Sequence, residues 1–280
     1  MSNNALYIYG IIKTSKNWKE HGIKGNNVFL INGRDFSAIA HRCEEKPYIS
    51  NNPIEVKDLI LAHNNILDKA MKNFDAVIPL SFNTIIKTSE EKTAEENLRI
   101  WLKDNKENLL KIWDKIIGKN EYGIRIYYEK KKLLEKIKEL YEIKQLQQKS
   151  QIESEGVAYL LKGKIKDEIN KKAQEQIFEY KQNFYNNIKE LVSDITINRS
   201  KILLDEEKNL LVSISILVDK KQIQKVNSYL VNSNFYFNIA GPFAPYSFIN
   251  PQESNFQDLQ KSIISEVSET LKNKGFCRNG

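Results

Sequence analysis

Residues able to do acid–base chemistry are few and scattered in this chain of 280 residues. Of its three histidines, His63 is the one that could act as a general base, beside Asp68 or Asp75. However, His63 falls between Ile60 and Leu67 on an apolar stripe, where a hydrogen-bonded core histidine is the more common outcome. We therefore predict that His63 belongs to the core.

No other group of residues has the spacing of a catalytic or metal-binding motif. His21 and His41 have no ligand-like spacing to His63, and the chain has no glycine-rich phosphate loop, nucleophile elbow or carboxylate-plus-histidine metal motif. Cys43 and Cys277 are too few for a disulfide framework, so we expect free thiols in a reducing cytosol. The prediction is a protein that is not an enzyme, with no catalytic, cofactor-binding or metal-binding residues.

The most unusual segment is 241–248, Gly-Pro-Phe-Ala-Pro-Tyr-Ser-Phe, which follows an apolar run directly. Proline fixes φ and removes an amide donor, so we predict a stiff extended or turning connection outside the interior of a sheet. Its rings either close the core of a domain or contact a partner with little loss of entropy. The candidate partner-contact or structural residues are Gly241, Pro242, Phe243, Pro245, Tyr246 and Phe248.

The strands that would position these residues begin with residues 5–12, which are aromatic and β-branched on both faces and therefore suit the middle of a sheet. Asn32-Gly33 predicts a tight turn between antiparallel strands 28–31 and 36–40. Residues 76–80 predict a short strand that ends at a proline.

Two long helices complete the predicted N-terminal α+β domain, residues 1–118. From Val56 the apolar side chains fall on one face for about five turns. That face carries Leu59, Ile60, His63, Leu67, Ala70, Met71 and Phe74. Residues 98–116 predict the second helix, with Trp101 and Trp113 on its core face and Gly118 as its stop.

Residues 119–250 predict a second α+β domain with the order β-α-β-β-α-β, which is the ferredoxin-like signature. The predicted elements are a strand at 122–128, helices near 131–195, a hairpin of strands 201–204 and 210–218 over the acidic turn 205–207, a helix at 220–233 and a strand at 235–239. The first crossover is oversized for this fold.

That crossover predicts a long helical hairpin, because it carries two apolar stripes. One stripe is Leu133, Ile137, Leu140 and Tyr141, and the other runs through Ile165, Ile169, Ala173, Ile177, Tyr180, Phe184, Ile188, Leu191 and Ile195. Residues 150–156 are the predicted turn, so the second helix would be ~40 residues, about 60 Å, long. Residues 251–280 predict an amphipathic helical tail.

Charge patterning argues against a polyanionic partner. The net charge is +7, but 43 basic and 36 acidic residues are interleaved, which weakens any steering field. The basic run 130–132 is accordingly predicted to be a solvated helix face. No apolar stretch approaches the ~20 residues of a membrane span, and no leader is visible. We expect a soluble cytoplasmic protein that binds neither nucleic acid nor a membrane.

Segment 241–248 is the last of seven blocks that together carry a family resemblance. The blocks are Leu6–Gly10, Asp35–Ala40, His63, Val77–Phe82, Glu121–Ile124, Glu155–Leu160 and Gly241–Phe248. In this order they resemble the gas vesicle protein L/F family, whose members carry a Gly-Pro-Trp-Pro-Pro-Tyr-Ser-Phe-like segment near the C-terminus. The chain departs from that pattern at Phe243 and Ala244, and also at Ser81 and Asn83.

The resemblance implies a non-enzymatic role in the assembly of the gas vesicle. Family members are accessory or minor structural proteins that act with the small amphipathic shell protein during nucleation or assembly of the shell. The implied partners are the gas vesicle shell protein and other gas vesicle accessory proteins, and the implied location is the cytoplasm and the gas vesicle. The residues themselves leave open a ferredoxin-like regulatory or small-molecule-binding module and, more distantly, an RNA binder.

Overall fold

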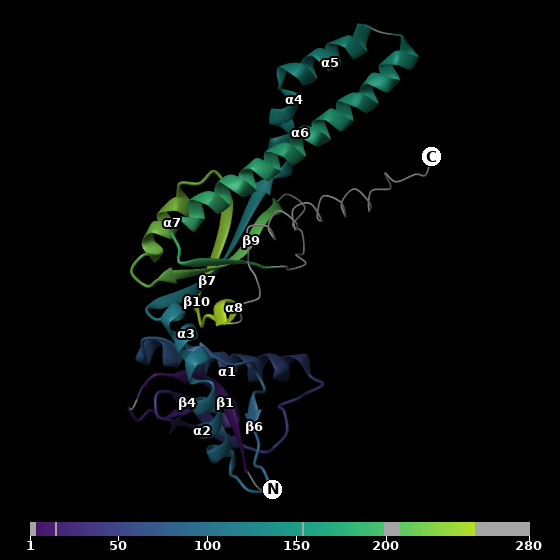
Figure 1. Ribbon diagram of the computed structural model, residues 1–280. Coiled ribbons are helices and arrows are strands. Elements are labelled where there is room, and N and C mark those ends of the chain that lie inside the picture. The colour runs from purple at the N-terminus through teal and green to yellow at the C-terminus, as the bar shows by residue number, and fades with distance from the viewer. Residues whose placement is uncertain (1–3, 15, 153, 199–207, 250–280) are drawn as a thin grey trace. The chain divides into compact units, whose positions relative to one another are not determined.

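The computed structural model describes residues 4–14, 16–152, 154–198 and 208–249 (Figure 1). They form two compact units of mixed helix and sheet. The first contains the described residues up to Tyr122, Leu217–Lys220 and those from Gly241 onward; the second contains those of Gly123–Ile216 and Lys221–Ala240. The domain boundaries at residues 118 and 250 stay a prediction, and the predicted tail lies outside the described residues.

A six-stranded sheet lies at the centre of the first unit, with the fully buried strand β1 in its middle. This confirms the strand predicted over residues 5–12. The strands are β1 (Ala5–Ile12), β2 (Glu20–His21), β3 (Asn27–Asn32), β4 (Ser37–Cys43), β5 (Ile78–Pro79) and β6 (Ile85–Ile86). Their order is β2-β3-β4-β1-β5, and β6 also pairs with β1.

The hairpin predicted around Asn32-Gly33 is confirmed. Strands β3 and β4 pair antiparallel with Asn32 opposite Ser37, and the Gly33 amide donates a hydrogen bond to the carbonyl of Phe36 at 2.9 Å. Before it, the short helix η1 (Ile23–Gly25) connects β2 to β3.

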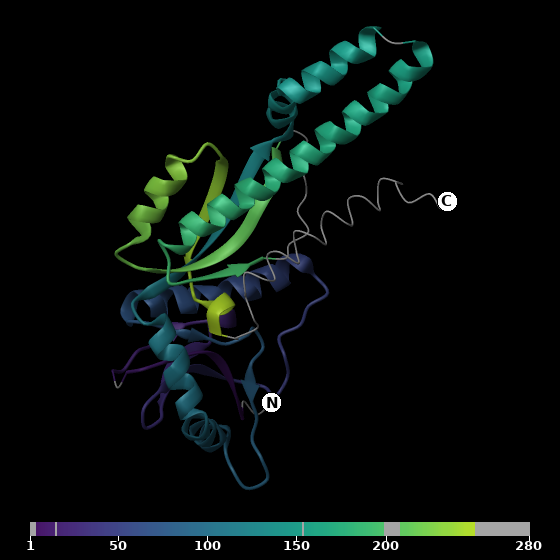
Figure 2. The same ribbon diagram turned by 45° about the horizontal axis from the view of Figure 1, so that its top comes forward.

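Alternate residues of β1 enter two different cores, because side chains of a strand alternate between the faces of a sheet. Leu6 and Ile8 pack in a cluster with α2 (Ala94–Asp104) and α3 (Lys106–Ile116). Tyr7 and Tyr9 pack in a cluster with α1 (Pro53–Asn73). The sheet therefore carries helices on both faces (Figure 2).

Helix α1 begins directly after its N-cap residue, Asn52. The side chain of Asn52 accepts a hydrogen bond from the Ile54 amide at 3.0 Å. Its buried residues are Leu59, His63, Ile66, Leu67 and Ala70, which confirms most of the predicted stripe. Ile60 was wrongly assigned to that stripe and is 40% exposed.

The single helix predicted over residues 98–116 is wrong, because the chain breaks into α2 and α3 at Asn105. The Asn105 side chain donates to the carbonyl of Trp101 at 2.9 Å, so it competes with the helical hydrogen-bonding pattern. The break also separates the two tryptophans. Trp113 is buried as predicted, whereas Trp101 is 36% exposed.

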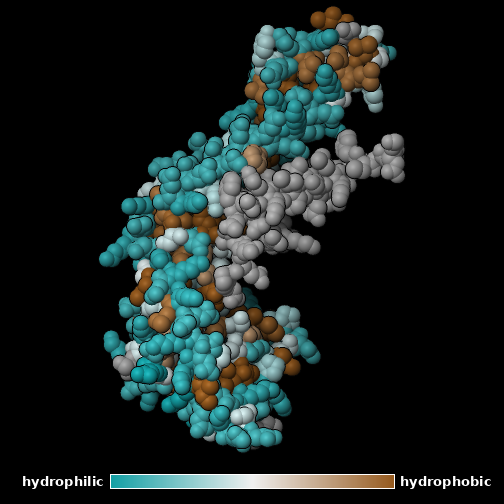
Figure 3. All heavy atoms as spheres, in the orientation of Figure 1, coloured by the Kyte–Doolittle hydropathy of each residue, from teal (hydrophilic) through white to brown (hydrophobic). Residues whose placement is uncertain are grey.

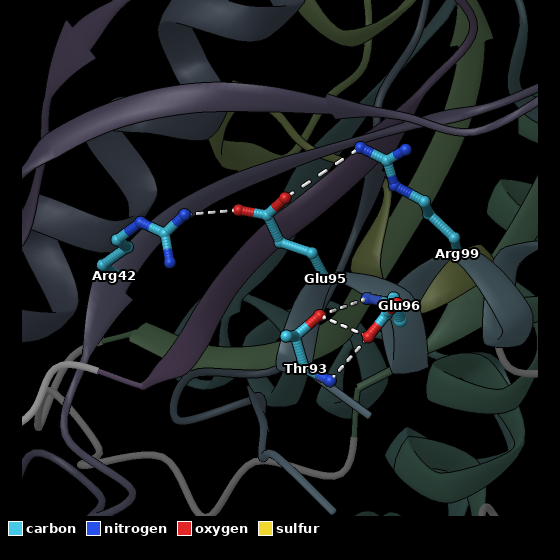
Figure 4. Close-up of polar contacts among 5 residues, drawn as sticks. All are labelled: Arg42, Thr93, Glu95, Glu96 and Arg99. Carbon is cyan, nitrogen blue, oxygen red and sulfur yellow. Dashed lines mark hydrogen bonds and ion pairs between the residues drawn. The ribbon is translucent and has the colours of Figure 1, made fainter. Parts of the chain in front are cut away.

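Helix α2 begins at a capping box, which Figure 4 shows. The Thr93 hydroxyl accepts from the Glu96 amide at 3.3 Å, and the Glu96 carboxylate accepts from the Thr93 amide at 2.8 Å. These bonds lower the pKa of Glu96. Beside them, Glu95 forms ion pairs with Arg42 at 2.5 Å and with Arg99 at 4.0 Å, which ties the start of α2 to β4.

A four-stranded sheet, most of it in the second unit, has the order β10-β7-β9-β8. Its strands are β7 (Lys119–Glu129), β8 (Asp194–Ile197), β9 (Lys208–Asp219) and β10 (Tyr236–Phe243). Helix α7 (Ile223–Val231) connects β9 to β10. The predicted strand 201–204 lies outside the described residues. The helical region predicted to reach residue 195 is too long, because β8 occupies its end.

The predicted helical hairpin is present, but its first arm is broken in two. The helices are α4 (Lys130–Lys138), α5 (Tyr141–Ile152) and α6 (Glu155–Lys189), and α5 and α6 lie side by side (Figure 1). Helix α6 has 35 residues. Leu133, Ile137 and Ala173 form a buried cluster that Ile169, Ile177 and Tyr180 border, which confirms the predicted contact of the arms.

Leu140 and Tyr141 were wrongly assigned to the buried stripe of that arm. They are 41% and 75% exposed, because the break between α4 and α5 shifts the helical phase at this point. Among the helices that the structure describes, none is long and apolar enough to cross a membrane.

Candidate functional site

Segment 241–248, singled out from the sequence, belongs to the first unit. The edge strand β10 continues through Gly241 and Pro242 to Phe243, and the short helix α8 (Tyr246–Ile249) follows. Pro242 sits on this edge strand, where proline is tolerated, which agrees with the prediction that the segment stays outside the interior of a sheet.

Tyr246 completes a hydrogen-bond chain through His63. The hydroxyl of Tyr7 lies 2.7 Å from His63 Nδ1, and the hydroxyl of Tyr246 lies 2.9 Å from His63 Nε2. At one end the Asn83 amide donates to Tyr7, and at the other Tyr246 donates to the carbonyl of Leu80 at 3.2 Å. One proton arrangement satisfies all four bonds, with Tyr7 donating to Nδ1 and Nε2–H donating to Tyr246.

This arrangement connects segments far apart in the sequence, since His63 lies on α1, Tyr7 on β1 and Tyr246 on α8. His63 is 1% exposed and is thus the hydrogen-bonded core histidine that the sequence predicted.

A second attachment lies beside the first. The buried carboxylate of Glu121 accepts from the Ser247 amide at 2.9 Å and from the Ser247 hydroxyl at 2.6 Å. Phe248 is 3% exposed within the cluster that contains Leu6 and Trp113. Segment 241–248 is therefore held by polar and apolar contacts at once.

Gly241 has a backbone conformation that favours glycine, with φ at 133°. A Cβ there would lie 2.8 Å from a ring carbon of Tyr122 and 2.9 Å from the carbonyl oxygen of Glu121. The Gly241–Pro242 peptide bond is cis. Pro242 and Phe243 are exposed, whereas Pro245 is buried, so the six candidate residues divide into an outward and an inward group.

Burial shifts the pKa values of the tyrosines and histidines around His63. It lowers the pKa of His63 and of His41 to about 4 and raises the pKa of Tyr7, Tyr9 and Tyr246 well above the ordinary tyrosine value. These groups stay neutral near pH 7, where a general acid or base would need a pKa close to neutrality. The arrangement can fix geometry, and it is poorly suited to moving protons.

His41 is buried within β4. Its Nε2 lies 2.9 Å from the hydroxyl of Tyr48, while its Nδ1 has no hydrogen-bond partner among the described residues. Among all the residues that the structure describes, no group of three or more histidine, cysteine, aspartate and glutamate residues could hold a metal ion.

The second unit contains an open groove of about 640 Å³ that the sequence did not reveal. Its walls come from α4, α6, the end of β7 and the segment that joins α7 to β10. The aromatic residues that line it are Tyr128, Tyr180, Phe184, Tyr229, Phe235 and Tyr236. Because they come from four separate elements, no single stretch of sequence signals them.

Unpaired polar groups lie between these rings. Four asparagines line the groove, namely Asn183, Asn187, Asn232 and Asn234, and none has a side-chain hydrogen bond to a described residue. On one wall Glu129 accepts from Tyr236 and pairs with Lys132 at 3.0 Å, whereas Lys136 has no ion pair with the described residues. The groove therefore offers ring faces, free carboxamides and a free cation.

Comparison with known protein families assigns the sequence to one of them. The family model described as gas vesicle synthesis protein GvpL/GvpF matches residues 5–250. The chain belongs to this family. Its members are structural or accessory gas vesicle proteins rather than catalytic ones.

Two gas vesicle proteins are similar to this chain in sequence. Gas vesicle protein L of Haloferax mediterranei is 23% identical over 241 residues, which cover 82% of this chain and 73% of the relative. Gas vesicle protein L1 of Halobacterium salinarum is 21% identical over 260 residues, which cover 88% and 90% of the two chains.

Two crystal structures of GvpF show the same fold. GvpF from Anabaena sp. PCC7120 superposes with a TM-score of 0.68 at 18% identity, over 89% of this chain and 100% of that one. GvpF from Microcystis aeruginosa gives a TM-score of 0.59 at 16% identity, over 88% and 99%. The GvpL/GvpF fold thus includes both compact units of this chain.

Proposed function

We propose that this chain is an accessory or minor structural protein of the gas vesicle that binds the small shell protein during nucleation or assembly of the shell. The observation that carries the proposal is the family match over residues 5–250. The proposed partners are the shell protein and other accessory proteins, in the cytoplasm and at the vesicle, without nucleic acid.

The groove of the second unit is the surface that best fits such a partner. A small shell protein that buries apolar faces against its own copies needs a partner to cover those faces before assembly. Tyr236, which lines the groove, leaves 44% of its surface exposed, and aromatic side chains of this kind are typical anchors of interfaces. The free asparagine carboxamides would supply hydrogen bonds to the partner's main chain.

Within this proposal, the inward-facing residues of segment 241–248 have a structural role. Tyr246 and Phe248 support the first unit through His63 and the apolar cluster. The exposed Phe243 remains available to a partner.

We also propose the ferredoxin-like topology for the second unit. Its support is the element sequence β7, hairpin helices, β8, β9, α7, β10 combined with the strand order β10-β7-β9-β8. This is the split β-α-β arrangement, in which the first and third strands are neighbours in the middle of the sheet.

Co-expression with the shell protein tests the proposed binding. We expect the two chains to elute together in size-exclusion chromatography at micromolar concentration and to crosslink. Separate elution without crosslinks would contradict the proposal.

One observation favours a second candidate, a small-molecule-binding module. The groove volume lies within the range of small-ligand sites, about 300–1,000 Å³. A metabolite that raises the melting temperature of the isolated chain, without any binding of the shell protein, would favour this reading.

A further inference from the structure

The groove of the second unit carries an unequal set of charges. Its charged lining residues, among those that the structure describes, are Glu129, Lys132 and Lys136. No arginine belongs to that described lining, and the other side chains there are aromatic, asparagine, serine and leucine. Figure 3 shows hydrophilic residues over the part of α6 that covers the sheet. The groove is therefore polar enough for charge to decide what binds in it.

Glu129 and Lys132 neutralise each other on one wall. The Lys132 ammonium lies 3.0 Å from each carboxylate oxygen of Glu129, and the Tyr236 hydroxyl donates to the same carboxylate. The hydrogen bonds to Glu129 raise the pKa of Lys132 and of Tyr236, so the ammonium stays charged and the hydroxyl stays neutral near pH 7. This wall has no charge left for a partner, and it holds the ring of Tyr236 in place.

Lys136 is the cation that this pairing leaves over. It lies one turn beyond Lys132 on the same face of α4. It makes no ion pair with any residue that the structure describes. The carboxylate that follows it by three residues, Glu139, pairs instead with Lys144 at 2.5 Å. The described lining of the groove thus has one positive charge in excess, and that charge is at Lys136.

Aromatic rings form the rest of the groove in fixed positions. Tyr180 and Phe235 meet edge to face with their centroids 5.3 Å apart, and the centroids of Phe184 and Tyr229 are 6.0 Å apart. Tyr180 also packs against buried residues of α4, the helix that carries Lys136. An ion pair formed beside such rings loses part of its water, which strengthens the attraction between the two charges.

We propose that the groove recognises a segment of the shell protein in which an acidic residue lies between apolar ones, and that Lys136 pairs with this carboxylate. The assignment rests on the proposed function, the binding of the shell protein to this groove. Charge complementarity selects the occupant, because one unpaired ammonium among rings matches one carboxylate among apolar side chains. A polyanion such as RNA would need several cations and would meet the carboxylate of Glu129.

Charge reversal on α4 tests the role of Lys136 in a binding titration of the shell protein. We expect Lys136→Glu to raise the Kd at least tenfold, and Lys136→Arg to keep it within about twofold. Lys138→Glu is the matched control and should also stay within about twofold. Lys138 is likewise exposed on α4 without an ion pair to a described residue, but it lies about 160° around the helix and outside the groove lining. Equal melting temperatures of the two glutamate variants would show that the fold is intact.

A carbodiimide, which joins an amine to a carboxylate in direct contact, identifies the partner residue. We expect mass spectrometry to find a bond between Lys136 and an aspartate or glutamate of the shell protein, and none from Lys138. If the shell protein binds but Lys136→Glu and Lys138→Glu have equal affinity, or if Lys136 couples only to carboxylates of this chain, the assignment of Lys136 is overturned while the proposed function stands. Absence of binding by the unaltered chain, or binding of oligouridine RNA in place of the shell protein, overturns both.

Discussion

At the scale of single residues, His63 decides how segment 241–248 is held. It accepts from Tyr7 on one side and donates to Tyr246 on the other, and both hydroxyls have a further partner in Asn83 or Leu80. A buried polar chain of this kind is stabilising only while every member is satisfied. The sequence could predict that His63 lies in the core, but not its partners, because Tyr7 is 56 and Tyr246 is 183 residues away.

Removal of one hydroxyl should therefore be costly. Tyr246→Phe leaves the Nε2–H of His63 and the Leu80 carbonyl without that partner, so we expect the free energy of unfolding to fall by about 1–3 kcal/mol. Urea denaturation at pH 7 measures it. Tyr122→Phe, whose hydroxyl has no hydrogen bond with the described residues, is the control and should change stability by less than about 0.5 kcal/mol. Equal effects of the two variants would show that the hydrogen bonds through His63 contribute nothing to stability.

Protonation of His63 should destabilise the fold in acid. Its pKa is lowered by burial from 6.5 to about 4, so between these values the unfolded chain binds a proton that the folded chain does not. Stability from this group is complete above about pH 6.5 and is lost as the pH falls toward 4. We expect a loss of about 2 kcal/mol between pH 7 and pH 5 from this histidine. A free energy of unfolding that is the same at both pH values would contradict a neutral buried His63.

At the scale of elements, the apolar pattern predicted what lies in a core and missed where elements stop. The strand over residues 5–12 was predictable because both its faces are apolar. The break at Asn105 was not, since it depends on a side chain that can bond either way. The groove of the second unit was also not predictable, because its rings come from β7, α6, α7, β10 and the segment that joins α7 to β10.

The hairpin offers a prediction at this scale. Ile137 is 4% exposed in the cluster between α4 and α6, so Ile137→Asp places a carboxylate in an apolar contact and should lower stability by several kcal/mol. Leu140→Asp is the matched control, because Leu140 is 41% exposed three residues later. Thermal unfolding monitored by circular dichroism compares them. Equal melting temperatures would mean that the two arms do not pack.

At the scale of the whole molecule, the chain returns to the first unit after building most of the second. Residues from Gly241 onward pack with Tyr7, His63 and Glu121, which belong to the first half of the sequence. This connectivity explains why the last family block is distant from its contacts along the chain. A motif at the end of one predicted domain can thus belong to another compact unit.

We propose that this chain binds the gas vesicle shell protein through the groove of its second unit. The most direct measurement is a binding titration of the shell protein against the unaltered chain, Tyr236→Ala and the control Ile49→Ala, whose side chain is 82% exposed in the first unit. We expect micromolar or tighter binding to the unaltered chain, a Kd at least tenfold weaker for Tyr236→Ala, and no change for Ile49→Ala. Absence of binding by the unaltered chain, or equal affinity of all three, would contradict it.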